Sequence, residues 1–431
     1  MSNSQRAKYD GPSPKLRFPE FDGKKLHDIR LGDVTEEPSA RNHGRLSSEV
    51  VMGVRKDEGI VPMEERLVAA NTSRYKIVKN DWFAYNPMRL NIGSIARWRD
   101  EEDVLVSPDY VVFRCRNKAD PTGLLPAYLD HFRQTKQWDA FVNGSGDGGV
   151  RVRIYYRDLA RMRMLLPDLA EQEKIAAALS SIDGLIDAEN CKLQKLKEYK
   201  RGLLQCLFPV PGEANPRLRF PTPNNDGDWR EINLGAILDG APNYGVNAPA
   251  VPYTQNLPTY LRITDISEDG RFLDENKMSV EVEANPDNTM QVGDIALVRT
   301  GASVGKSYIH IEKNGPLVFA GFLIRIRINH KEFSPRYIFQ FLRSDRYWMW
   351  VEKTSKRSGQ PGLNSSEYAS LIVPMPGGSS IDSLQQQSRI ADFLSSIDNK
   401  IEAQSNVVSE LRAHKSGLMQ LLFPVSGVLE R

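Results

Sequence analysis

Two long stretches of the chain carry apolar residues at alternating steps of three and four. In the first stretch these residues are Ile175, Leu179, Ile182, Ile186, Leu193, Leu196, Leu203 and Leu207, with Glu189 and Lys200 in the two steps that an apolar residue does not fill. In the second stretch they are Ile390, Leu394, Ile397, Ile401, Val408, Leu411, Leu418 and Leu422. This spacing, held over about four heptads with charged residues outside it, is typical of coiled-coil helices. The alternative is a stripe that packs only on its own globular domain.

Both predicted helices end at a Phe-Pro pair, Phe208-Pro209 in the first and Phe423-Pro424 in the second. The residue before a proline is pushed out of the α region of backbone space, so neither helix can continue past its pair. A helix of about 36 residues rises about 54 Å along its axis. Each helix is therefore long enough to separate two globular parts of one chain.

The two stretches are copies of one another. Residues 171–210 align without a gap on residues 386–425, and 19 of the 40 aligned positions are identical. Shorter motifs recur around them, including Pro-x-Leu-Arg-Phe-Pro at residues 14–19 and 216–221. A repeat at this distance predicts two similar halves, each a globular domain followed by one long helix.

The predicted fold class is α+β, with two target-binding globular domains separated by two long antiparallel coiled-coil helices in a pseudo-two-fold repeat. The second helix leaves the second domain, so it must run back to pair with the first helix. Its last turn should then lie near residues 14–19. The predicted boundaries are a tail at 1–13, domains at 14–168 and 211–377, helices at 169–210 and 378–425, and a tail at 426–431.

Within each globular domain, a strand containing alternating arginines leads into an aromatic-rich helix. These helices are expected around residues 127–138 and 335–350, and each is followed by a Gly-rich loop. Trp138, Trp348 and Trp350 are expected in the domain cores. Each domain should close on a short apolar strand, at residues 164–167 and 371–374.

Charge is unevenly distributed along the chain, although the formal net charge is only +2. Residues 226–298 contain 4 basic and 13 acidic residues, whereas residues 299–357 contain 12 basic and 4 acidic residues. Residues 110–165 contain 10 basic and 5 acidic residues. Basic stretches that also carry aromatic residues are typical of surfaces that bind a phosphate backbone. A solvated charged surface is the competing interpretation.

Cysteine spacing favours a protein that resides in a reducing compartment, and hydropathy predicts no membrane span. Cys115, Cys191 and Cys206 show neither disulfide nor metal-ligand spacing. No apolar run reaches the roughly 18 residues of a membrane span. The polar start of the chain does not resemble a signal peptide. We expect a cytoplasmic protein without a metal site.

Several enzyme motifs can be tested, and none is complete. Residues 301–307 resemble a phosphate-binding loop, but the first glycine is one residue too close to Gly305-Lys306. Gly144, Gly146 and Gly149 fit a dinucleotide-binding pattern, yet a strand-like segment follows instead of the required helix. Methyltransferase and nuclease signatures are also incomplete. These failures indicate a binding protein that performs no catalysis.

The repeated motifs resemble a known family. The segment Leu-Pro-Asp-Leu-Ala-Glu-Gln at residues 166–172 leads into Ile-Ala-x-x-Leu-Ser-Ser-Ile-Asp, and the helix ends in Lys-x-Gly-Leu-x-Gln-x-Leu-Phe-Pro. The helix motifs occur in both halves, with Gln386-Gln387 in place of Glu-Gln in the second. In these features the chain resembles the specificity subunit of type I restriction-modification systems over nearly its whole length.

The resemblance implies a division of labour between chains. Each globular domain would read one half of an interrupted sequence of double-stranded DNA, and the helices would set the spacing of the halves. Two methyltransferase subunits, and through them the restriction and motor subunits, would be separate partner chains. S-adenosylmethionine would bind the methyltransferase partner, so no cofactor is expected here. A coiled-coil protein tether that reads no DNA is the alternative.

Candidate DNA contacts follow from side-chain chemistry. Arg and Lys suit guanine and phosphate, and Asn and Gln suit adenine. In the first domain the candidates are Arg89, Asn91, Arg97, Arg99, Asn143, Ser145, Arg151 and Arg153. In the second they are Arg299, Thr300, Ser303, Lys306, Lys356, Arg357, Gln360 and Asn364, with Gly301 and Gly305 forming a turn. The helix stripes, from Ile175 to Leu196 and from Ile390 to Leu411, are the candidate surface for helix pairing and partner binding.

Overall fold

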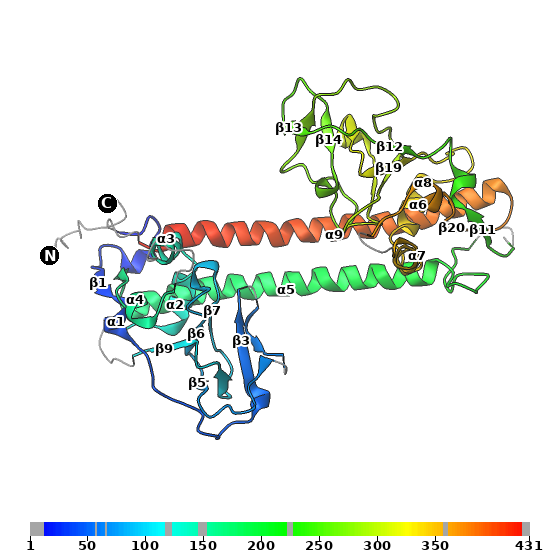
Figure 1. Cartoon of the computed structure of the whole chain (residues 1–431). Coiled ribbons are helices and arrows are strands. Elements are labelled where there is room, and N and C mark those ends of the chain that lie inside the picture. The colour runs from blue at the N-terminus through cyan, green and yellow to red at the C-terminus, as the bar shows by residue number, and fades with distance from the viewer. Residues whose placement is uncertain are drawn as a thin grey trace. The chain divides into compact units, whose positions relative to one another are not determined.

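The structure is a computed structural model that describes residues 13–424 apart from 57, 65–66, 117–122, 145–152, 222–226 and 357–360. Two long helices, α5 (Leu169–Leu207) and α9 (Ser380–Leu422), dominate a mixed α/β chain (Figure 1). Each helix ends directly before its Phe-Pro pair, as the sequence predicted. The chain divides into two compact units, which we call the first unit (residues up to 190 and from 407 onward) and the second unit (residues 191–406).

The described residues of the first unit form three small sheets. Strand β1 (His27–Arg30) pairs antiparallel with β10 (Arg163–Leu166). The second sheet has the order β2 (Thr35–Glu36), β9 (Val111–Cys115), β6 (Phe83–Tyr85), β7 (Ile95–Arg97). The third has the order β4 (Gly59–Pro62), β3 (Val51–Arg55), β8 (Val104–Val106), β5 (Lys76–Val78). Its β3–β8 pair is parallel.

In the second unit, the part of the chain that the structure describes also forms three sheets, of matching size. Strand β11 (Arg230–Asn233) pairs antiparallel with β20 (Ile372–Met375). The next sheet has the order β12 (Asn243–Tyr244), β19 (Leu323–Ile326), β16 (Ile295–Val298), β17 (Ser307–Ile309). The last has the order β13 (Ala250–Pro252), β15 (Met278–Val280), β14 (Thr259–Leu261), β18 (Leu317–Phe319), with β14 and β18 parallel.

Short helices complete each unit. The first unit has α1 (Leu31–Val34), α2 (Pro126–Phe132), α3 (Lys136–Gly144), α4 (Tyr156–Leu159) and the 3₁₀ turns η1 (Pro19–Phe21), η2 (Ser48–Val50) and η4 (Leu90–Ile92). The second unit has α6 (Pro335–Phe341), α7 (Asp345–Ser355), α8 (Ser365–Ala369) and the 3₁₀ turns η5 (Leu234–Ile237), η6 (Ile263–Asp265) and η7 (Glu312–Asn314).

Each predicted aromatic helix is two helices in the structure, so the prediction of one continuous helix was wrong. The break after α6 comes at Ser344, whose hydroxyl accepts a hydrogen bond from the Tyr347 N–H and caps α7. The break after α2 comes at Thr135, whose hydroxyl donates to the Phe132 carbonyl at 2.7 Å. Short polar side chains compete for backbone hydrogen bonds in this way and favour helix starts. The strand-like segment expected after residue 150 is described only from residue 153, where no strand forms.

The core of each unit includes residues from both long helices. In the first unit, Ile175 and Leu179 of α5 share a core with Met419 and Leu422 of α9 and with Phe423. In the second unit, Leu203, Leu204 and Leu207 of α5 share a core with Ile390, Leu394 and Ile397 of α9. Each globular part therefore packs on the helix that it leads into and on one end of the other helix.

Polar contacts between the helix segments repeat this arrangement. In the first unit Asp183 binds Lys415 at 2.7 Å and Asn190 accepts from Arg412 at 3.4 Å, so the two segments run antiparallel there. In the second unit Asp398 binds Lys200 at 2.6 Å. The Leu16 N–H donates to the Leu421 carbonyl at 3.0 Å, which places the end of α9 beside residues 14–19 as predicted.

Most of the helix stripe is buried within the units. Ile175, Leu179, Ile186, Leu193, Ile390, Leu394, Ile397, Ile401 and Val408 are buried, and Ile182, Leu196 and Leu411 are half-buried. The stripe was also predicted to bind partner chains. The buried residues are covered by the chain itself, which fits the helix-pairing part of that prediction; partner binding by the stripe stays a prediction.

Candidate functional site

Each unit has a hairpin loop that lies against the segment before a short helix. In the first unit this is the first site loop, residues 86–94 between β6 and β7; in the second it is the second site loop, residues 299–306 between β16 and β17. The Ile154 N–H donates to the Pro87 carbonyl at 3.0 Å, and the Leu363 N–H donates to the Arg299 carbonyl at 2.8 Å. The two loops thus hold equivalent places in their units.

Two glycines shape the second site loop. Gly301 and Gly305 have φ of +82° and +92°, so both adopt the left-handed conformation that glycine tolerates best. A Cβ atom at Gly305 would also lie 2.8 Å from the Val351 side chain. The predicted turn is therefore present, and it brings Arg299, Thr300, Ser303 and Lys306 into one loop.

The basic residues of the second site loop have different surroundings. The Arg299 guanidinium lies 4.8 Å from the centroid of the Tyr244 ring, a cation–π contact. Its Nε is buried without a hydrogen-bond partner among the described residues. Lys306, by contrast, forms an ion pair with Glu268 at 2.5 Å. Arg299 is therefore the stronger candidate for a ligand contact.

The first site loop exposes polar and apolar side chains together. Arg89 and Asn91 are exposed, as are Met88 and Ile92 on either side of them. Arg153, which directly precedes the anchoring residue Ile154, lines a cavity of about 710 Å³ beside this loop. The structure thus brings Arg89, Asn91 and Arg153 to one region of the first unit.

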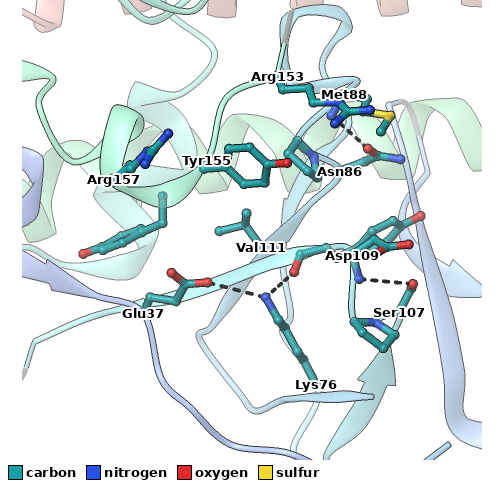
Figure 2. Close-up of a pocket in the computed structure, with 14 residues that line it drawn as sticks. Glu37, Lys76, Asn86, Met88, Ser107, Asp109, Val111, Arg153, Tyr155 and Arg157 are labelled. Atoms are coloured by element: carbon teal, nitrogen blue, oxygen red, sulfur yellow. Dashed lines mark hydrogen bonds and ion pairs between the residues drawn. The ribbon is translucent and has the colours of Figure 1, made fainter. Parts of the chain in front are cut away.

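Figure 2 shows how charges of both signs line this cavity. Asn86 and Arg153 lie on the side opposite Glu37 and Lys76, and Asp109 faces the same space. The Lys76 ammonium donates to the Tyr110 carbonyl at 2.6 Å and lies 3.4 Å from a Glu37 carboxylate oxygen. Burial lowers the pKa of Lys76, and Glu37 partly opposes that shift. The cavity therefore offers hydrogen-bond acceptors as well as donors.

Arg97 and Arg99 both lie against a buried carboxylate, that of Asp130. Arg99 binds Asp130 at 2.9 Å, Arg97 approaches it at 3.4 Å, and Arg133 binds it at 2.8 Å. Burial would raise the pKa of Asp130, but the three arginines hold it below its ordinary value. These two predicted DNA contacts thus take part in a structural ion-pair cluster, where Arg97 is largely covered.

The remaining candidates are scattered or lie outside the described residues. Asn143 is exposed on α3, and Lys356 pairs with Glu352 one helical turn away on α7. Asn364 caps α8 by accepting from the Glu367 N–H at 2.9 Å, so its carbonyl oxygen is already used. Ser145, Arg151, Arg357 and Gln360 lie outside the described residues.

The charge asymmetry seen along the sequence is largely neutralised in space. Of the 12 basic residues in 299–357, seven pair with carboxylates: Lys306, Arg325, Arg327, Arg336, Arg343, Arg346 and Lys356. The acidic partners of Arg325, Arg327 and Lys306 come from the acidic stretch 226–298. The inference of a broad basic surface from this stretch was therefore too simple.

Three exposed residues near Arg299 were not predicted. Tyr244 stacks on Arg299, and Asn247, three residues after Tyr244, is exposed. Phe322 is 60% exposed. The Phe322 carbonyl accepts from the Arg299 N–H at 3.1 Å. Phe322 lies in an apolar run, so a hydropathy pattern assigns it to the core.

The prediction that Trp138, Trp348 and Trp350 lie in the domain cores was wrong for Trp348, which is 41% exposed. Trp138 is buried and Trp350 is half-buried.

The described part of the chain contains no cluster of three or more His, Cys, Asp or Glu side chains that could hold a metal ion. None of its helices combines the length and the apolar character needed to cross a membrane.

Residues 259–411 match the family model described as the type I restriction modification DNA specificity domain. The chain carries a type I specificity domain. This domain spans most of the second unit and extends into α9. Specificity subunits are the DNA-recognition subunits of type I systems and are not themselves catalytic.

Curated relatives of the specificity domain extend the similarity to more of the chain. The type I restriction enzyme MjaVIII specificity subunit of Methanocaldococcus jannaschii is 23% identical over 68% of this chain and 68% of its own length. The putative MjaX specificity subunit of the same organism is 21% identical over 83% of this chain and 81% of its own.

A solved structure shares the fold. The crystal structure of a type I restriction-modification S subunit from M. genitalium superposes with a TM-score of 0.56 at 15% identity. It covers 96% of this chain and 100% of the other. At this identity the match establishes a common fold.

Proposed function

We propose that this chain is the DNA sequence-specificity subunit of a type I restriction-modification complex. Each globular part, residues 14–168 and 211–377, reads one half of a bipartite target in double-stranded DNA. The observation that carries the proposal is the pair of equivalent site loops, one of them inside the specificity domain. Because the two loops carry different side chains, the two half-sites should differ in sequence.

The proposed DNA contacts are those candidates in or beside the two site loops that bind no carboxylate among the described residues. In the first unit these are Arg89, Asn91 and Arg153, and in the second they are Arg299, Thr300 and Ser303. A guanidinium can bind guanine or a phosphate, and a hydroxyl can bind a phosphate. Arg97, Arg99, Lys306 and Lys356 would first have to leave the carboxylates that they bind.

The long helices act, in this proposal, as the spacer between the two half-sites and as the surface for methyltransferase subunits. The helices present exposed apolar side chains that no core uses: Leu185 and Tyr199 on α5 and Val407 on α9 are 46%, 54% and 40% exposed. Such residues suit a protein interface better than the buried stripe does. The motor and restriction subunits would join through the methyltransferase.

The proposal is tested by DNA binding at rising salt. The full chain, co-purified with a methyltransferase partner, is mixed with a pool of randomised duplexes, and the bound duplexes are sequenced. We expect an interrupted motif, and we expect affinity for it to fall steeply with salt because phosphate contacts release counterions. Arg299→Ala should weaken binding and relax only one half of the motif.

Exchange of residues 14–168 for those of a relative provides the matched test of modularity. Only the other half of the motif should then change. If no motif is enriched and binding does not respond to salt, the chain is a protein tether and the proposal is wrong.

A further inference from the structure

Each unit contains the same turn beside its site loop. In the first unit residues 107–110 connect β8 to β9, and the Tyr110 N–H donates to the Ser107 carbonyl at 3.0 Å. In the second unit residues 320–323 connect β18 to β19, and the Leu323 N–H donates to the Ala320 carbonyl at 2.8 Å. The third residue of each turn, Asp109 or Phe322, is exposed. The same backbone thus presents different chemistry in the two units.

The exposure of the Phe322 side chain is not explained by packing within the fold. The residues around it in the run, Phe319 and Leu323, are fully buried, whereas Phe322 is 60% exposed. Its carbonyl accepts a hydrogen bond from the Arg299 N–H at 3.1 Å, so Phe322 lies at the base of the second site loop. An exposed phenyl group gains free energy when an apolar ligand group covers it.

The residues around Phe322 are suited to a base pair. A Cβ atom at Gly321 would lie 1.9 Å from the side-chain oxygen of Asn247, so the Asn247 amide lies directly against this turn. Arg299 and the Tyr244 ring complete the same surface. In the major groove an asparagine amide pairs with adenine, and an apolar side chain covers the C5-methyl group of thymine.

Asp109 has opposite chemistry at the equivalent place. Its exposed carboxylate faces the cavity that Glu37 also lines, on the side away from Arg153 (Figure 2). Glu37 is paired with Lys76, so Asp109 is the carboxylate free to accept a hydrogen bond from an exocyclic amino group. Cytosine N4 presents such a group in the major groove and is a preferred partner of Asp and Glu.

We propose that the third residue of this turn is the base-reading position of each unit. Phe322 packs against a thymine methyl group in one half-site, with Asn247 toward the paired adenine, and Asp109 accepts from the amino group of a cytosine in the other. This inference rests on the proposed function and adds to it the base pair that each turn selects.

The thymine contact is tested by removing only the methyl group from DNA. The probe is the duplex enriched by the full chain, with each thymine of the half-site read by the second unit replaced in turn by deoxyuridine. We expect one replacement to weaken binding about fourfold, the change that one lost methyl-sized contact produces. With Phe322→Ala, that replacement should have no further effect. Val292→Ala truncates an exposed apolar residue (68%) outside residues 320–323, and this variant should still lose about fourfold in binding on deoxyuridine replacement.

Several outcomes would overturn the inference while leaving the proposed function intact. These are an enriched motif whose second half lacks an A·T pair, no response to deoxyuridine, and an equal response in Phe322→Ala and the unmodified chain. If the chain enriches no motif at all, the proposed function fails, and this inference fails with it. Because Phe322 is exposed, the alanine variant should keep its thermal midpoint, which is measured alongside.

The Asp109 contact is tested by discrimination at one base pair. Asp109→Asn replaces one acceptor oxygen by a donor, so the preference for cytosine over thymine at one position should fall by at least about fivefold. The second half of the motif should be unchanged. Asp22→Asn, an exposed carboxylate in the same unit, is the control. Unchanged preferences at every position in Asp109→Asn would refute the role of this turn in the first unit.

Discussion

At the scale of single residues, one ion-pair arrangement occurs twice. In the second unit Asp398 binds Lys200 at 2.6 Å, Arg343 at 3.0 Å and the Gln340 amide at 2.8 Å. Burial lowers the pKa of Lys200 to about 8, and the Arg343 charge adds to the shift while Asp398 opposes it. Burial would raise the pKa of Asp398, but Arg343 and Lys200 hold it below its ordinary value. The carboxylate therefore compensates two buried cations.

Asp398→Asn should strongly destabilise the second unit, because it leaves Lys200 without its ion-pair partner and Arg343 with only Asp269, at 3.5 Å. Breaking a buried pair in this way costs about 3–5 kcal/mol. Lys200→Met should cost less, since Asp398 keeps Arg343. Asp392 lies on α9, like Asp398, and forms an exposed ion pair with Arg336 of α6. Asp392→Asn should therefore cost at most about 1 kcal/mol. Hydrogen exchange of α6 amides measures all three; equal losses would refute this ranking.

The equivalent position in the first unit holds a histidine. His131 takes the place of Gln340, with its Nε2 3.0 Å from the Ser180 hydroxyl and its Nδ1 3.8 Å from Asp183. Burial lowers the pKa of His131 to about 4; Lys415 and Arg99 add to the shift, and Asp183 and Asp130 oppose it. The imidazole is therefore neutral in the folded unit at pH 7.

The lowered pKa of His131 predicts that the first unit becomes less stable as the pH falls. Its pKa is about 4 when folded and about 6.5 when unfolded, so the unfolded chain binds the proton first as pH falls. Stability of the first unit should fall from pH 6.5 downward, by about 2 kcal/mol at pH 5. His131→Gln should remove that part of the loss. Hydrogen exchange of the α2 amides at pH 7 and pH 5 measures this loss of stability. An identical loss in His131→Gln would exclude His131 as the cause.

At the scale of elements, each long helix begins in one unit and contributes its last turn to the core of the other unit. Phe423, after α9, lies 5.0 Å from Tyr128 and 5.8 Å from Phe132 between ring centroids in the first unit. Phe208, after α5, lies 5.3 Å from Tyr337 and 5.5 Å from Phe341 in the second. Each end is also tied by a backbone hydrogen bond, from Leu16 to Leu421 and from Leu218 to Cys206.

This arrangement predicts a crossed pattern of destabilisation. Phe423→Ala should lower the stability of the first unit by about 3–5 kcal/mol, and Phe208→Ala should do so in the second, as expected for emptied aromatic core sites. Exchange of α2 and α6 amides reports the two units separately. Leu421→Ala, at a position 38% exposed beside Phe423, is the control and should have little effect. If Phe423→Ala loosened α6 instead of α2, the assignment of α9 to the first core would be wrong.

At the scale of the whole molecule, the proposed spacer makes a prediction about the DNA target. Both helices pass from one unit to the other, α5 after residue 190 and α9 after residue 406. Four residues inserted at both places lengthen each helix by about 6 Å and add about one turn. Base pairs advance about 3.4 Å, so the unread spacer should grow by one or two base pairs.

A matched insertion of two residues at both places serves as the control. It turns the helix by about 200° and should abolish specific binding. Methylation-site mapping reads out both variants. A spacer of unchanged length in the four-residue variant would show that the helices do not measure the DNA.

The sequence by itself determined the features that depend on neighbouring residues. The heptad spacing and the Phe-Pro pairs predicted both long helices to their last turn, because proline restricts the residue before it regardless of what packs nearby. The glycines of the second site loop predicted its turn for the same local reason, since glycine tolerates positive φ. The repeated motifs also indicated the specificity-subunit family.

Only the tertiary structure decided which side chains are available to a ligand. Arg299 and Lys306 belong to the same basic stretch, but one stacks on Tyr244 and the other binds Glu268, residues far away in the sequence. Phe322 and Leu323 are adjacent and both apolar, yet one is exposed and the other fully buried. Burial and ion pairing depend on contacts between distant segments, and composition and periodicity along the chain do not contain them.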